Sequence, residues 1–296
     1  MYYLFFSDDL NINYHYLHIF EHSVLDFFKK QAFIGCGGYT SYNIISCKVN
    51  SILKKNHNFK KIIESDFFKF MSYDYFLKQL KQIELEYSLY NPQKIPPITF
   101  EKFKTLKKKL KKINYFVFKD TKLILSKGHY KPKIDFIGAK SWQNDKNKFI
   151  LFDKINNKYA QLQNFVNFDQ IFNDLIKKDN SNCKIAVNFE IFSSTMALTI
   201  YNTGQQKLSL KHIDNYLSKF NLFFSKTDLN KLRLNSQTTY NYFVWDRPIM
   251  KNLERNILFL IGQKQINFNE LEPTQIISEL KKMSTTFESR KRMVMF

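Results

Sequence analysis

The stretch TTYNYFVWDRPIMKNLERNILFLIG, residues 238–262, holds the clearest change of pattern in the chain. It begins with β-branched and aromatic residues typical of a strand, and Arg247-Pro248 ends that strand because proline has no N–H for the sheet. Apolar residues at helical spacing follow, and Gly262 closes them. Outward from this stretch the sequence predicts the order α-β-β-α-β-α, with helices at 208–220, 249–261 and 273–292 and strands at 228–235, 238–245 and 265–271.

This order resembles the type II KH domain of small-subunit ribosomal protein S-three, together with the helix that follows it. The resemblance covers under a third of the chain and implies a KH-like RNA-binding domain at 201–296. It also implies a structural role, without catalysis, in the head of the mitochondrial small ribosomal subunit. The matching residues are Arg247, Pro248, Leu253, Glu254, Arg255, Gly262, Ile266, Asn267, Glu270, Pro273, Phe287, Glu288 and Arg290.

The chain departs from the family pattern in two places. No glycine follows Pro248, where the family has a Gly-x-x-Gly loop that approaches phosphates. The family also continues into a second domain, which implies a split protein whose C-terminal half is separately encoded or lost. The resemblance implies small-subunit ribosomal RNA and other small-subunit ribosomal proteins as partners. It places Arg290, Lys291 and Arg292 near mRNA in the entrance channel.

The charge of the chain also indicates a polyanionic partner. There are 46 Lys+Arg and 26 Asp+Glu, a formal net charge of +20. The abundance of Lys and Phe beside only seven Gly is typical of an AT-rich genome, so part of this charge reflects codon bias. Arginine is then expected mainly where a planar, bidentate donor is needed. The arginines are Arg233, Arg247, Arg255, Arg290 and Arg292.

The lysine-rich run KFKTLKKKLKK, residues 102–112, predicts a helix with one narrow apolar stripe of Phe103, Leu106 and Leu110. Lysines cover the rest of its circumference, which suits contact with RNA phosphates; a solvated surface helix is the alternative. The expected RNA-binding residues are Lys102, Lys104, Lys107, Lys108, Lys109, Lys111, Lys112, Arg233, Arg247, Lys251, Arg255, Arg290, Lys291 and Arg292.

Residues 1–200 are expected to form a mostly helical extension, with a domain boundary near residue 200. Apolar spacing predicts helices over 10–34 and 62–88, and Gly35 to Gly38 are interpreted as the turn that closes the first. Short strands are predicted in INYFVF, KLIL, AVNFEIF and MALTIYN. The expected fold class is therefore α+β.

Three histidines lie close together near the N-terminus. His15, His18 and His22 would share one face of a helix and could hold zinc with Cys36 or Cys47. A hydrogen-bonded, partly buried helix face is the alternative, and we favour it because aromatic residues surround all three. Asp8-Asp9 could bind a divalent ion, although no third partner is evident, and a helix start explains them equally well. The sequence thus predicts no resident metal, no cofactor and no catalytic residues.

The remaining features concern the compartment. Three cysteines cannot form a disulfide framework, and no apolar run is long enough to predict a membrane span. The N-terminal residues resemble no targeting signal. The ribosomal resemblance implies the mitochondrial matrix, and without a targeting signal a protein working there is expected to be organelle-encoded, which agrees with the AT-rich composition. The alternatives are an accessory subunit of a respiratory complex and a nucleic-acid enzyme of an AT-rich plasmid or phage.

Overall fold

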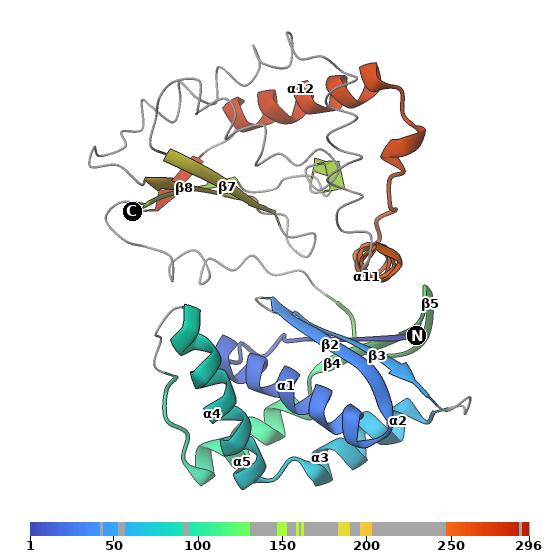
Figure 1. Cartoon of the computed structure of the whole chain (residues 1–296), viewed down its shortest axis with the longest axis vertical. Helices are drawn as coiled ribbons and strands as arrows, with labels where there is room; N and C mark the ends of the chain where they lie inside the picture. Colours follow the sequence, from blue (N-terminus) through green and yellow to red (C-terminus); the bar gives the residue numbers. More distant parts are fainter. Residues whose placement is uncertain are drawn as a thin grey trace. The chain divides into compact units, whose positions relative to one another are not determined.

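The computed structural model describes residues 1–41, 44–52, 57–90, 95–130, 147–152, 158–159, 161–162, 183–189, 196–202, 247–289 and 292–295. The chain divides into two compact units, Met1–Lys133 and Ile134–Phe296 (Figure 1). Each unit combines an antiparallel sheet with helices, so the α+β class is confirmed. The sequence-based boundary near residue 200 lies inside the second unit and stays a prediction.

A five-stranded antiparallel sheet frames the first unit. Strand β1 lies at its centre, hydrogen-bonded to β3 and β4, and is fully buried from Tyr3 to Phe6 because bulky apolar side chains occupy both of its faces. The sequence analysis did not predict this strand. The order is β2-β3-β1-β4-β5, with bounds β1 Tyr2–Ser7, β2 Phe33–Ser41, β3 Ile44–Ser51, β4 Asn114–Lys119 and β5 Lys122–Lys127.

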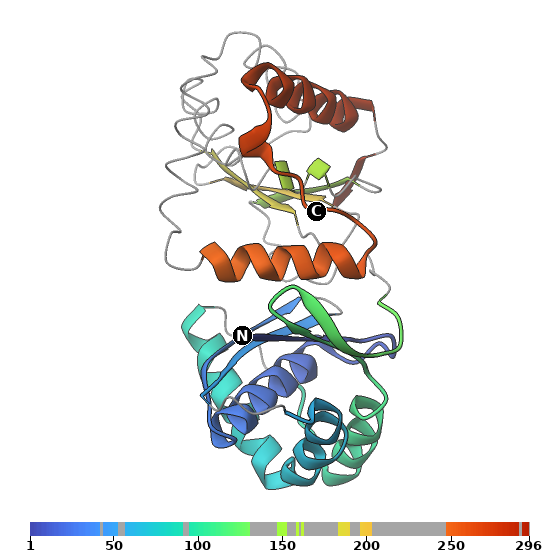
Figure 2. The ribbon, with the colours of Figure 1, turned by 90° about the vertical axis from the view of Figure 1, so that its right-hand side faces the viewer.

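Helices cover one face of this sheet, as Figure 2 shows. They are α1 Tyr14–Lys30, α2 Phe59–Lys61, α3 Phe67–Phe70, α4 Tyr73–Tyr90 and α5 Phe100–Leu110, with a π-helical turn at Ile62–Asp66. Aromatic rings join the two layers: Phe20 of α1 lies edge-on to Phe6 of β1 at 5.2 Å and to Phe67 of α3 at 5.4 Å between ring centroids. Such edge-to-face pairs add to the stability gained from burial.

Polar groups fix where α1 begins. The Asn13 side chain accepts a hydrogen bond from the backbone N–H of His15, which caps the helix. Just before it, the Asp8 carboxylate accepts from the N–H groups of Leu10 and Ile12 at 2.8 and 2.6 Å. The buried positions of α1, such as Leu17 and Phe20, then set which side of the helix faces the core.

Several predicted elements of the first unit need correction. The helix predicted at 10–34 ends at Lys30, after which Ala32 takes a positive φ of 62°. The residues from Gly35 to Gly38 are not a turn: they belong to β2, whose register shifts between Ile34 and Gly37, a bulge that glycine tolerates. The helix predicted at 62–88 is broken into a π-turn, α3 and α4. The apolar stripe of α5 and strands β4 and β5 are confirmed.

The second unit has a four-stranded antiparallel sheet, ordered β7-β8-β6-β9, and two long helices. The helices confirm two predicted elements, but Arg292 lies in strand β9 and not at the end of a helix. The bounds are β6 Asn147–Phe152, β7 Cys183–Phe189, β8 Met196–Asn202, α11 Arg247–Leu260, α12 Pro273–Ser289 and β9 Arg292–Met295.

The strand predicted at 265–271 is wrong. A short 3-10 turn, Phe268–Glu270, stands there instead. The Gln161 side chain accepts from the N–H of Ile266 at 2.7 Å and donates to the carbonyl of Lys264 at 3.2 Å, so part of this backbone bonds to a side chain and not to a neighbouring strand. The strands predicted at 228–235 and 238–245 lie outside the described residues. The KH-like arrangement is therefore not confirmed.

Within the described part of the chain, no helix is both long and apolar enough to cross a membrane.

Candidate metal centre

Two neighbouring helices of the first unit bring three metal-binding side chains together. His18 and His22 are one turn apart on α1 and so lie on the same side of it. Glu86 comes from α4, and its Oε2 lies 3.5 Å from His22 Nε2. One donor atom from each of the three residues lies within 4.8 Å of the others, and all three side chains are partly buried. This spacing suits a single bound cation.

The donor set fits zinc. Two imidazoles and one carboxylate are the protein ligands of one class of catalytic zinc site, and such sites keep a further position open for water or substrate. Burial lowers the pKa of His18 to about 4, with further lowering by the positive charges of His22 and His15. Burial lowers the pKa of His22 as well, although Glu86 opposes it. Both imidazoles are therefore neutral at pH 7, which is the form that binds a metal.

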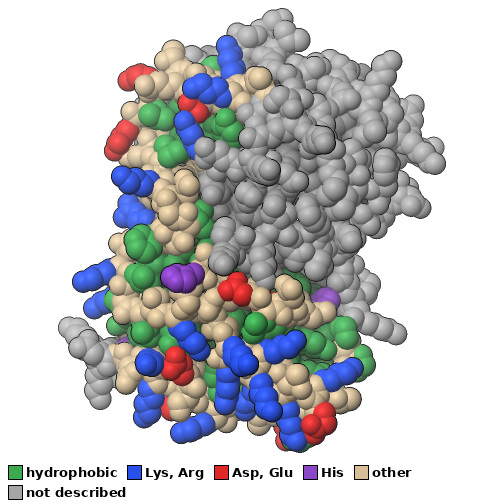
Figure 3. All heavy atoms as spheres, turned by 180° about the vertical axis from the view of Figure 1, so that it is seen from behind, with side chains coloured by type: hydrophobic (Ala, Val, Ile, Leu, Met, Phe, Trp, Pro, Cys, Tyr) green, Lys and Arg blue, Asp and Glu red, His purple; other side chains and the backbone are tan. Residues whose placement is uncertain are grey.

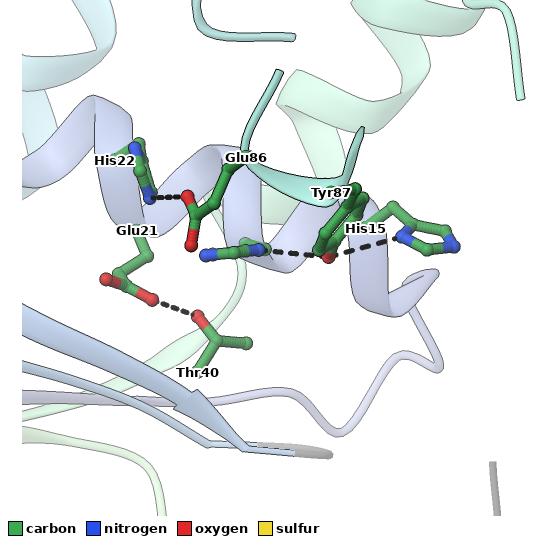
Figure 4. A network of polar contacts seen from close by, with 7 residues as sticks. His15, Glu21, His22, Thr40, Glu86 and Tyr87 are labelled. Carbon is green, nitrogen blue, oxygen red and sulfur yellow. Dashed lines mark hydrogen bonds and ion pairs between the residues drawn. The ribbon is translucent and has the colours of Figure 1, made fainter. Parts of the chain in front are cut away.

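A second carboxylate, that of Glu21, lies beside this group on α1. Its side chain is only 4% exposed and turns toward β2, where the Thr40 hydroxyl donates to its Oε2 at 2.5 Å (Figure 4). Burial raises the pKa of Glu21 to about 7; the hydrogen bond from Thr40 opposes the rise and the charge of Glu86 adds to it. Glu21 can therefore both accept and release a proton near neutral pH.

Gly38 of β2 makes room for the Glu21 carboxylate. A β-carbon placed on Gly38 would lie 2.5 Å from Glu21 Oε1 and 2.9 Å from its Cδ, closer than non-bonded atoms tolerate. Gly38 and Thr40 stand two residues apart and so on the same face of the strand. Gly38 leaves space for the carboxylate of Glu21, and Thr40 holds that carboxylate by a hydrogen bond.

The hydroxyl of Tyr87, the residue after Glu86, lies 3.0 Å from Nδ1 of His18 and 3.4 Å from Nδ1 of His15. His15 does not belong to the group of three donors in the structure. Of the three histidines that the sequence analysis brought together, two are therefore candidate ligands. Cys36 and Cys47 do not belong to the group either. They were considered as a further ligand beside the histidines, and the structure places Glu86 there.

The sequence analysis missed Glu21 and a readable motif. His18-x-x-Glu21-His22 is the inverted zinc-peptidase sequence, in which the glutamate between two histidine ligands acts as the base. The histidines were considered without the acid between them, so this motif was not part of the prediction. Glu86 carried no local signal, since it reaches the site only through the packing of α4 against α1.

The lysines predicted to bind RNA lie on α5 and just beyond it. Phe103, Leu106 and Leu110 are buried as predicted, and all of these lysines are exposed except Lys107. Lys107 Nζ donates to the carbonyl of Met71 at 2.6 Å, so it has a structural role. Figure 3 shows many basic side chains on one face of the first unit, and all of them are lysines because residues 1–133 contain no arginine. The exposed lysines are Lys102, Lys104, Lys108, Lys109, Lys111 and Lys112.

The basic residues predicted in the C-terminal part are spread over several elements. Arg247 and Lys251 lie on α11, Arg292 lies in β9, and Arg255 is exposed on α11 with its Nε 3.4 Å from Gln265 Oε1. Arg233, Arg290 and Lys291 lie outside the described residues.

Two solved structures resemble this chain in fold over nearly its whole length, and a third is less similar. A protease from Helicobacter pylori is 12% identical, with 99% of this chain and 92% of that chain covered and a TM-score of 0.58. A conserved protein from Enterococcus faecalis V583 is 12% identical, with 96% and 90% covered and a TM-score of 0.52. A putative M16-like peptidase from Alicyclobacillus acidocaldarius is 10% identical, with 99% and 91% covered and a TM-score of 0.48. No protein-family model and no curated protein matches the sequence.

These likenesses correct the ribosomal interpretation. The resemblance to ribosomal protein S-three is wrong, because nearly the whole chain has the fold of a solved protease. The predicted structural role in the mitochondrial ribosome, the RNA and ribosomal-protein partners and the absence of catalysis are wrong with it. The fold supports neither the respiratory subunit nor the nucleic-acid enzyme. The mitochondrial location stays a prediction.

The Glu21 carboxylate gives a prediction for the metal-free protein. Its pKa in the folded state is about 7 against an ordinary value of 4.5, so folding favours its protonated form. The folded state then binds more protons than the unfolded state between these values. The contribution of Glu21 to the free energy of unfolding should therefore be largest below pH 4.5 and fall as the pH rises to 7. From the size of the shift, this loss is on the order of 3 kcal/mol.

Urea unfolding of the metal-free wild type and the Glu21→Gln variant, with chelator present, checks this. The uncharged glutamine should make the variant the more stable of the two at pH 8. That advantage should shrink as the pH falls to 4.5. A difference between the two proteins that is the same at both pH values would show that Glu21 ionises normally.

Proposed function

We propose that this protein is a zinc-dependent peptidase whose site consists of His18, His22, Glu86 and Glu21. The observation that carries the proposal is the convergence of three zinc donors within 4.8 Å, with a buried carboxylate next to one of them in the motif. Similar structures support the fold, and one of them is described as a protease. A fold hosts many functions, so the activity is argued from the site.

The residues divide the work between binding and proton transfer. His18, His22 and Glu86 would hold the zinc ion. When bound, the ion would supply Lewis acidity and make a water molecule more acidic. Glu21 accepts the proton that the water loses as its oxygen attacks the peptide carbonyl carbon. The same carboxyl then gives this proton to the leaving amine nitrogen when the C–N bond breaks. Because Thr40 holds Oε2, Oε1 is the oxygen for this transfer.

The sheet indicates the form of the substrate. Strand β2 is at the edge of the five-stranded sheet, and it carries both Gly38 and Thr40, which adjoin Glu21. Residues Gly37 to Tyr39 are exposed, so their backbone is accessible. An extended peptide can add to such an edge by main-chain hydrogen bonds, with little demand on its sequence. The substrate class we propose is therefore an unfolded or extended peptide.

The test is hydrolysis of a mixture of unstructured peptides by the purified full chain, followed by mass spectrometry. We expect internal cleavage that stops when 1,10-phenanthroline removes the metal and returns when zinc is added. A parallel preparation of the His22→Leu variant controls for contaminating proteases. Cleavage that is equal in the variant or unaffected by the chelator, or no cleavage by the zinc-loaded protein, would overturn the proposal.

Gly38→Ala gives a further prediction. The added methyl must displace the Glu21 carboxylate, because the atoms that it meets are the flexible end of that side chain. We expect kcat to fall by about 10²-fold, since a misplaced catalytic group costs about that much. Zinc affinity should stay unchanged.

The control adds the same methyl at Gly37, where no atom lies within 4 Å. This variant leaves Glu21 in place, so its kcat should stay within about twofold of the wild type, whatever happens to KM. Steady-state kinetics and zinc titration of both variants make the comparison. Equal kcat values for the two would show that Gly38 does not make room for a catalytic Glu21.

A further inference from the structure

The Tyr87 hydroxyl lies between two imidazoles. Its oxygen is 3.0 Å from Nδ1 of His18 and 3.4 Å from Nδ1 of His15, and Figure 4 shows the hydroxyl pointing between the two helices. The ring packs against both histidines, with centroid distances of 5.7 Å to His18 and 5.4 Å to His15. The ring is partly buried, and its contacts with both histidines keep the hydroxyl near the two Nδ1 atoms.

This contact decides which nitrogen His18 offers to a metal. A neutral imidazole carries one proton, and the nitrogen that keeps it cannot be the ligand. If His18 Nδ1 donates its proton to the Tyr87 oxygen, Nε2 is left to coordinate. The hydroxyl proton of Tyr87 then points to the other neighbour, His15 Nδ1, which accepts it. The three groups form a directed chain from His18 through Tyr87 to His15.

Helix α4 therefore contributes twice to one site. Glu86 supplies a metal donor, and the next residue, Tyr87, holds a donor that belongs to α1. Metal-binding histidines generally donate their second N–H to a carboxylate, a backbone carbonyl or a water, and loss of such a partner typically weakens metal binding by about 10–100-fold. The Tyr87 oxygen takes this place for His18.

We infer that Tyr87 is a positioning residue for the metal ligand His18, and that His15 acts through Tyr87 and is not itself a ligand. This inference rests on the proposed zinc site. It also assigns a role to His15, which is not one of the three metal donors.

The test measures zinc affinity of the full chain by competition with a chromophoric chelator. Tyr87→Phe removes the hydroxyl and keeps the ring, so we expect binding to weaken by about 10–100-fold. The visible spectrum of the cobalt(II)-loaded variant should also shift, because His18 can then change its orientation. The matched control is Tyr75→Phe, on the same helix, whose hydroxyl donates to Asp26 at 2.7 Å. The control should bind zinc as the wild type does.

His15→Phe separates the two roles considered for this histidine. If His15 acts through Tyr87, the His15→Phe substitution should weaken zinc binding by only about threefold. In a protein that already carries Tyr87→Phe, the same substitution should cause no further loss. If His15→Phe costs more than Tyr87→Phe, or if the two losses add fully in the double variant, His15 is a ligand and the inference is wrong.

Different results would refute the proposed zinc site and the proposed role of Tyr87. A wild-type chain that binds no zinc refutes the proposed site. A wild-type chain that binds zinc, together with a folded Tyr87→Phe variant of equal affinity and unchanged cobalt(II) spectrum, refutes the positioning role alone.

Discussion

Replacement of Glu21 by glutamine is expected to lower kcat for peptide hydrolysis by about 10²–10⁴-fold, the usual contribution of a general acid–base group. Glutamine has nearly the same shape and can still accept the hydrogen bond that Thr40 donates. It cannot take a proton from water. Zinc affinity should stay within a few-fold of the wild type, because Glu21 is not one of the three donors.

The measurement is steady-state kinetics on a peptide found to be cleaved, with zinc content determined on the same samples. Asp26→Asn on the same helix is the matched control, since the Asp26 carboxylate contacts Tyr75 and Lys30 and not the donor group. Its kcat should be that of the wild type. A Glu21→Gln variant that keeps full kcat with zinc bound would show that another group transfers the proton.

Replacement of Glu86 by glutamine should remove most of the stabilisation that zinc gives. A ligand that binds only the folded state stabilises it by about 2.7 kcal/mol at a concentration 100 times its Kd. For a domain the size of the first unit this corresponds to a rise in Tm of roughly 5–10 °C. The neutral amide is a poor zinc ligand beside two imidazoles, so the variant should show almost no rise at the same zinc concentration.

Thermal unfolding with and without added zinc makes this comparison. Glu84→Gln is the control, because Glu84 is exposed on the same helix and does not belong to the donor group. It should keep the full rise in Tm. If Glu86→Gln and the wild type gain equally from zinc, the ion binds elsewhere and Glu86 is not a ligand.

The spacing of apolar residues predicted several helices and strands correctly. The apolar stripe of α5, the strand β5 and the helices α11 and α12 follow directly from periodicity. Strand β4 follows from a short continuous apolar run, and its residues from Tyr115 to Phe118 are all buried. The ends of α1 and the bulged strand β2 were missed. Gly35 to Gly38 lie in an edge strand with a bulge. They were interpreted as a turn because glycine after a helical pattern more often marks the end of a helix.

Distant contacts explain why the KH interpretation failed. It depended on weak matches at suitable separations, including a strand at 265–271. Gln161, more than 100 residues away in the sequence, satisfies part of that backbone instead. A pattern confined to the last 90 or so residues contains no sign of such a partner.

Only the part of the candidate site that lies on α1 could be predicted from the sequence. His18, Glu21 and His22 form a motif that is visible in the sequence, and a search that included the acid between the histidines would have found it. Glu86, Thr40 and Tyr87 join the site from α4 and β2. Their positions depend on the packing of those elements against α1, which no local spacing records.

The decisive experiment for the zinc site is titration of the metal-free full chain with zinc, with a chromophoric chelator as competitor and the His22→Leu variant alongside. We expect the wild type to take up one equivalent of zinc with high affinity and the variant to take up none. If the wild type takes up no zinc, or if the variant binds it equally well, His18, His22 and Glu86 do not form a zinc site.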